Sequence, residues 1–144
     1  MSHTHVSNRL HCVFSTKDRK PFFDEELQPR LWSYVGGIAH NLDIEIIAIG
    51  GSCDHMHMLI ALPAKFALAE AMQKIKANSS RWLTQVIGTR GFAWQEGYGA
   101  FSVSISQTDA TVTYIHAQPE HHRKRDYAEE FRKMLAMHGI SLPS

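Results

Sequence analysis

The chain has 144 residues, of which 44% are hydrophobic and 20% charged, and this balance predicts one globular domain over residues 1–144. No apolar run approaches the roughly 18 residues that a membrane-spanning helix needs. A net charge of +1 does not by itself indicate a nucleic-acid partner. The chain has only two cysteines, and its polar N-terminus lacks the layout of a secretory signal, so we expect a cytoplasmic protein.

The predicted elements alternate between strands and helices. Strands are indicated by apolar residues at every second position, and helices by apolar residues three or four positions apart. In chain order they are a strand at 10–15, a helix at 24–42, strands at 44–49 and 55–62, a helix at 68–86, a strand at 101–105, a helix from 106 and a helix at 127–138.

The order β-α-β-β-α-β predicts an α+β fold of the ferredoxin-like (RRM-like) kind. Such a fold has an antiparallel sheet with helices on one face, followed here by two additional C-terminal helices. In this topology the strands at 10–15 and 55–62 are the central pair. We therefore expect the other face of the sheet to be open and able to carry a site.

A His-x-His pair gives the strongest functional signal. Side chains alternate along a strand, so His55 and His57 share one face while Met56 and Met58 point into a core on the other. Such a pair can be two polar residues on a solvent face, or half of a metal site. No Asp-His follows it as in metallo-β-lactamases, Leu59 replaces the third histidine of histidine-triad hydrolases, and the chain is too short for an amidohydrolase barrel. A small two-histidine site that needs a third ligand remains.

Tyr114 and Gln118 lie four residues apart on the third predicted helix and share a face. The glutamine carbonyl could be the third ligand, leaving positions for a phosphate oxygen. The tyrosine could then attack that phosphate, although an ordinary phenol, with a pKa of ~10, is a weak nucleophile. A single tyrosine is more often a packing residue. Tyr98 is the alternative nucleophile, and Pro119 is expected to kink the helix beside Gln118.

A polar face runs along the helix predicted at 68–86. Lys74, Asn78 and Arg81 fall on it at successive turns, with Lys76 and Ser80 alongside. Cationic and hydroxyl side chains in this arrangement could contact a nucleic-acid backbone, or they could form an ordinary solvated face.

Taken together, these segments resemble the HUH-type single-strand tyrosine transposases of the smallest insertion sequences, the IS200 type and its REP-associated relatives. The resemblance covers nearly the whole chain, through segments 11–17, 54–59, 79–82, 94–99, 114–118 and 121–123. It implies that His55, His57 and Gln118 bind Mg²⁺ or Mn²⁺ and that Tyr114 is the nucleophile. Arg123, in the last segment, joins the residues of the polar helix face as a predicted DNA contact.

The resemblance also implies the reaction. Tyr114 would form a covalent 5′-phosphotyrosine link to single-stranded DNA and release a 3′-hydroxyl, which resolves the link on another strand. Family members recognise hairpins near the element ends. They act as homodimers in which the histidines of one subunit meet the tyrosine of the other.

Three other functions stay open at this point. A rolling-circle-type HUH endonuclease would use the same chemistry, usually with a longer chain. A domesticated DNA-hairpin-binding protein would keep the binding surface without transposition. A metal-dependent hydrolase unrelated to DNA would keep only the metal site.

Overall fold

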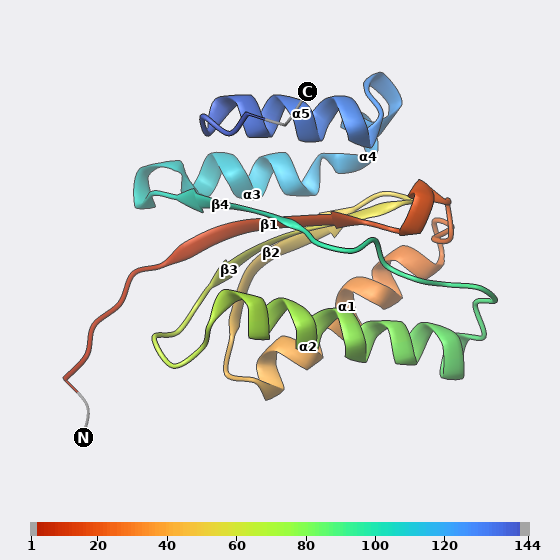
Figure 1. Ribbon diagram of the computed structural model, residues 1–144, viewed down its shortest axis with the longest axis horizontal. Coiled ribbons are helices and arrows are strands. Elements are labelled where there is room, and N and C mark those ends of the chain that lie inside the picture. Colours follow the sequence, from red (N-terminus) through yellow and green to blue (C-terminus); the bar gives the residue numbers. More distant parts are fainter. Residues whose placement is uncertain (1–2, 142–144) are drawn as a thin grey trace.

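One four-stranded antiparallel sheet, in the order β2-β3-β1-β4, organises the chain (Figure 1). The structure is a computed structural model that describes residues 3–141, without the side chains of 122–124. The strands are β1 (Arg9–Ser15), β2 (Glu45–Gly51), β3 (His55–Ala61) and β4 (Gly99–Val103). The helices are α1 (Leu27–Asn41), α2 (Leu68–Trp82), α3 (Thr108–His116), α4 (Gln118–Lys124) and α5 (Tyr127–Met137), and a π-helical turn (Leu83–Ile87) continues α2. This confirms the predicted α+β, ferredoxin-like order and its central pair, β1 and β3.

The first face of the sheet carries the main hydrophobic core. Cys12 and Phe14 of β1 point to this face together with Met56 and Met58 of β3, as the strand alternation predicts. Helices α1 and α2 cover it (Figure 1). The intervening residues of both strands, the two histidines among them, therefore point to the second face.

The second face is not open, and the prediction that helices cover only one face is wrong. Helices α3, α4 and α5 pack over this face (Figure 1). Val13, Leu59 and Phe101 make this face largely apolar, and they are buried against Ile115 of α3 and Leu135 of α5. An exposed apolar sheet face is unfavourable in water, so the C-terminal helices fold back over it.

Helix α3 approaches the sheet closely because β2 carries a glycine where they meet. A Cβ atom on Gly50 would lie 2.7 Å from the backbone oxygen of Ile115. Any larger residue would push α3 away from the sheet, and Tyr114 stands next to Ile115. Gly50 therefore helps to set the distance between Tyr114 and β3.

The C-terminal region forms three helical segments where two helices were expected. The backbone leaves helical geometry at Ala117, and α4 begins at Gln118 with Pro119 in its first turn, where proline needs no hydrogen-bond partner. The break expected beside Gln118 is thus confirmed, whereas the prediction that Tyr114 and Gln118 share one helix is wrong, because α3 ends at His116 and Gln118 is the first residue of α4. Asp126 caps the N-terminus of helix α5, where its carboxylate accepts a hydrogen bond from the Glu129 N–H at 2.9 Å. Within the described residues, none of these helices is long and apolar enough to span a membrane.

Candidate active site

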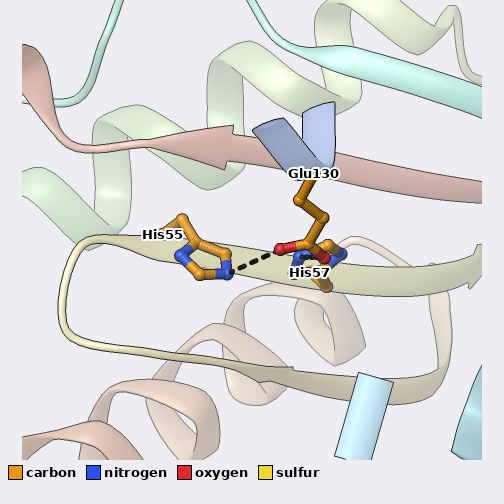
Figure 2. Close-up of side chains that lie close together, drawn as sticks. All are labelled: His55, His57 and Glu130. Atoms are coloured by element: carbon orange, nitrogen blue, oxygen red, sulfur yellow. Dashed lines mark ion pairs between the residues drawn. The ribbon is translucent and has the colours of Figure 1, made fainter. Parts of the chain in front are cut away.

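His55 and His57 lie side by side on β3 with no solvent-exposed surface. Their ring centroids are 5.1 Å apart, and both rings point toward the helices that cover the second face (Figure 2). This burial rules out two polar residues on a solvent-exposed face. Buried imidazoles need polar partners, and the structure supplies several.

The partner that the two rings share is Glu130 of α5, which sequence reasoning missed. Figure 2 shows its carboxylate reaching down between the two rings. Its Oε1 lies 3.3 Å from Nε2 of His57, and its Oε2 lies 3.9 Å from Nε2 of His55. The signal in the sequence is that Glu130 lies on the apolar face of its helix, with Tyr127 and Met134, where a carboxylate needs a buried partner.

The orientation of the His55 ring is set by its neighbour in sequence. The Nδ1 atom of His55 donates to Oδ1 of Asp54 at 2.7 Å, and this pairing turns Nε2 toward the middle of the cluster. Oε1 of Gln118 lies 2.8 Å from that Nε2. The amide of Gln118 is held in this orientation because its Nε2 donates to Glu130 Oε1 at 2.9 Å. Nε2 of His55 and Oε1 of Gln118 therefore converge on one point, where a cation could bind both atoms.

The second histidine also has a partner at its far nitrogen. Nδ1 of His57 and Nε2 of His11, on β1, are 2.7 Å apart, and His11 was not assigned a role from the sequence. Burial lowers the pKa of His57 to about 4. Burial, assisted by the neighbouring His57, lowers the pKa of His11 to about 3. Both rings are therefore neutral at pH 7, as metal-binding imidazoles must be.

These residues fit a divalent metal ion. The ligand atoms of His55, His57 and Glu130 lie within 4.8 Å of one another. Among the described residues, Nε2 of His57 and Oε2 of Glu130 are buried without a partner in hydrogen-bond geometry. Two imidazole nitrogens, a carboxylate oxygen and the amide oxygen of Gln118 form a mixed donor set that suits a divalent first-row ion such as Mn²⁺.

Tyr114 lies at the edge of this cluster, beside the histidines of its own chain. Its ring centroid is 5.8 Å from that of His57, and its hydroxyl donates a hydrogen bond to Oε1 of Glu130. Burial raises the pKa of Tyr114 above its ordinary value, and the nearby Glu130 raises it further. The phenol is therefore neutral at pH 7 and needs a proton acceptor before it can act as a nucleophile.

The glutamate is held ionised by the same neighbours. Burial alone would raise the pKa of Glu130, but hydrogen bonds and charge from His57, with those from Tyr114 and Gln118, outweigh it and lower the pKa to about 2. The structure thus brings Tyr114, Gln118, His55 and His57 together as the sequence predicts, with Glu130 at their centre.

The predicted DNA contacts of α2 lie across the sheet from this cluster. Lys74 is 3.8 Å from Glu70, and the Arg81 side chain donates to Asn78 at 3.2 Å. Lys76 instead donates to the backbone oxygens of Gln95 and Gly97, both at 2.7 Å. Ser80 is half-buried on the same helix, and the side chain of Arg123 lies outside the described part of the structure. The roles of these six residues stay predictions.

Comparison with known proteins gives consistent results. The family of IS200-like transposases matches residues 4–118. The transposases of the insertion sequence IS200 from Salmonella typhimurium and Salmonella typhi are each 27% identical over 126 residues, which cover 83% of this chain and 82% of each relative.

Two solved structures share the fold. A candidate transposase from Deinococcus radiodurans has a TM-score of 0.64 at 20% identity, covering 82% of this chain and 96% of that one. A REP-associated tyrosine transposase bound to a REP hairpin has a TM-score of 0.61 at 18% identity, covering 85% and 74%.

Proposed function

This chain belongs to the family of IS200-like transposases, and we propose that it cuts and rejoins single-stranded DNA through a covalent link to Tyr114. The observation that carries the proposal is the contact between the Tyr114 hydroxyl and Glu130, whose carboxylate also faces both histidines. A nucleophile, a proton acceptor and a candidate metal site thus meet in one buried cluster.

The cleavage step uses groups already in contact. The Tyr114 oxygen attacks a DNA phosphorus, the new O–P bond forms, and the bond from phosphorus to the 3′ oxygen breaks. Glu130 takes the phenol proton at Oε1, and the same proton then passes from Glu130 to the departing 3′ oxygen, so the step balances. Attack by a 3′-hydroxyl of another strand reverses these steps. Because one phosphodiester bond replaces another, no ATP is needed.

We propose that His55, His57, Glu130 and Gln118 hold Mg²⁺ or Mn²⁺. Such an ion supplies Lewis-acid polarisation of the phosphoryl oxygen and stabilises negative charge during attack. The protein supplies the orientation: Asp54 fixes the His55 ring, and His11 fixes the His57 ring. This is the HUH type of site, with Glu130 added to the ligands expected from the sequence.

We propose DNA hairpins as the binding partner, since one structural neighbour carries a REP hairpin. Lys74, Asn78, Ser80 and Arg81 remain the proposed contacts on α2, together with Arg123 of α4. Lys76 is the weakest member of this set because its ammonium group is already bonded to two backbone oxygens. A homodimer with shared sites stays a prediction, and the position of Tyr114 beside its own histidines supports a site completed within one chain.

The test is a covalent adduct. Single-stranded oligonucleotides covering both strands of the DNA that flanks the gene are labelled at their 3′ ends and incubated with Mg²⁺ or Mn²⁺. We expect an adduct that survives denaturing electrophoresis, because the tyrosine keeps the downstream fragment. Tyr114→Phe should abolish it, whereas Tyr98→Phe should retain it, since Tyr98 packs against the main core. An adduct in Tyr114→Phe overturns the nucleophile assignment. Hairpin binding without any adduct would indicate a DNA-binding protein without transposition.

A further inference from the structure

A surface pocket of about 350 Å³ opens directly onto Tyr114. Helix α5 forms much of its wall with Glu130, Lys133, Met134 and Met137, which share one helical face at spacings of three, four and seven residues. Any strand that reaches the Tyr114 oxygen from this side has to pass through the pocket. The residues that line the pocket would therefore contact the substrate strand.

Two cations line this pocket, and neither has a counter-ion within the part of the chain that the structure describes. Arg125 and Lys133 both line it and both are exposed to solvent. Among the described residues, neither side chain has a carboxylate within ion-pair distance. Glu130 is the one acid that lines the pocket within the described residues, and it is occupied by His57, Tyr114 and Gln118. Arg125 also lies close enough to Tyr114 for its charge to lower the pKa of the phenol, against the larger effects that raise it.

The rest of the lining suits a nucleobase. The centroid of the His121 ring lies 4.7 Å from that of the Tyr114 ring, and His121 is half-buried and lines the pocket, so it supplies an aromatic side chain there. Met137, which also lines the pocket, is 74% exposed although it is a large apolar side chain. Single-stranded nucleic acids are bound by surfaces of this composition, where cations contact phosphates and aromatic or apolar groups contact bases.

We propose that this pocket is a subsite for single-stranded DNA, in which Arg125 and Lys133 bind the phosphates that flank the bond attacked by Tyr114. His121 and Met137 contact the base of the nucleotide between them. The subsite rests on the proposed function, because it places the strand for the Tyr114 nucleophile. In this proposal the C-terminal helices bind the substrate as well as cover the second face of the sheet.

The test measures the salt dependence of binding. Wild type, Arg125→Ala/Lys133→Ala and a charge-matched control, Lys65→Ala/Arg90→Ala, are titrated with fluorescent oligo(dT) of 20 nucleotides in Mg²⁺ over a range of salt concentrations. Each phosphate contact to a single strand contributes about 0.7 to the slope of log K against log salt, so the double variant should lose about 1.4. Its affinity at low salt should fall at least about tenfold, and the control should keep the wild-type slope.

Two further variants separate binding from folding. Arg125→Lys/Lys133→Arg keeps both charges and should restore the slope, whereas Met137→Asp should weaken binding with an unchanged melting temperature. If Arg125→Ala/Lys133→Ala has the same slope of log K against log salt as Lys65→Ala/Arg90→Ala, the subsite is overturned. It is also overturned if the wild-type protein fails to bind oligo(dT) at low salt. A change in oligomeric state without a change in slope also overturns it, in favour of a contact between subunits. The proposed function fails separately, if wild type binds oligo(dT) but never forms the Tyr114 adduct.

Discussion

Oδ1 of Asp54 and Nδ1 of His55 lie 2.7 Å apart. Side chains of consecutive residues in a regular strand point to opposite faces, so this contact between neighbours in sequence needs an explanation. The pairing is possible because Asp54 precedes β3, where the chain has not yet entered the regular alternation of the strand. It orients the ring so that Nε2 of His55 faces Glu130 and Gln118. Asp54 therefore orients a ring of the candidate metal site without being one of the candidate ligands.

The first prediction concerns Asp54→Asn. The variant should bind Mn²⁺ roughly 10–100-fold more weakly, as is typical when the outer partner of a metal-binding histidine is removed. Calorimetric titration with Mn²⁺ measures this, and Asp43→Asn, which changes an exposed carboxylate, is the control. If both variants bind Mn²⁺ with equal affinity, Asp54 has no role in orienting His55.

The second prediction tests the carboxylate at the centre of the cluster. Glu130→Gln removes a candidate ligand and should weaken Mn²⁺ binding by more than the roughly 10–100-fold expected for an outer partner. The adjacent Glu129→Gln changes a solvent-exposed carboxylate on the same helix and should bind normally. Wild-type affinity in Glu130→Gln would leave Gln118 as the third ligand, as the sequence resemblance implies.

The third prediction concerns acid stability without metal. The pKa values of His57 and His11 are lowered to about 4 and about 3, against about 6.5 in an unfolded chain. Below pH 6.5 the unfolded chain binds protons that the folded chain does not, so the free energy of unfolding decreases as the pH falls. From pH 7.5 to pH 5 we expect a loss of up to about 4 kcal/mol for the two rings.

Urea unfolding in EDTA at several pH values measures this loss. The variant His11→Asn has one titrating ring fewer and should show roughly half of the pH dependence. A free energy of unfolding that stays constant between pH 7.5 and pH 5 would mean that these rings are not buried in the neutral form.

The fourth prediction decides whether one chain completes its own site. Tyr114→Phe and His57→Ala should each abolish the DNA adduct. Because Tyr114 lies beside the histidines of its own chain, a mixture of the two variants should also form no adduct. Adduct formation in the mixture would show that the tyrosine of one subunit serves the histidines of the other, as the family resemblance implies.

The fifth prediction separates packing from DNA binding on α2. Lys76→Met loses two hydrogen bonds from a charged, half-buried group and should destabilise the protein by about 1–3 kcal/mol. Lys74→Met loses only an exposed pair with Glu70 and should change stability by less than about 0.5 kcal/mol. Thermal unfolding measures both, and equal stabilities would contradict the structural role of Lys76.

A DNA-hairpin binding experiment tests the same face of α2 for its proposed role in DNA binding. Lys74→Ala/Arg81→Ala should weaken binding of a DNA hairpin at low salt, while the adduct with an unstructured oligonucleotide should be unaffected because α2 lies across the sheet from Tyr114. Unchanged hairpin affinity would remove this face from the proposed DNA contacts.

The sequence by itself determined the elements and half of the site. The alternation of His55 and His57 with Met56 and Met58 follows from strand geometry alone, and the structure confirms which residues face the main core. The spacing of Tyr114 and Gln118 likewise predicts that they lie close together, and the break at Pro119 is a local backbone property. Local rules of this kind act over a few residues and can be read from the chain.

Only the tertiary structure decided what completes the site. Glu130 and His11 lie 75 residues after and 44 residues before His55, and no local pattern relates them to it. They meet because the apolar second face of the sheet has to be covered, and α5 covers it with the face that carries Glu130. Hydrophobic packing therefore decided which carboxylate lies between the two histidines, and it enclosed a site that the sequence placed on an open sheet.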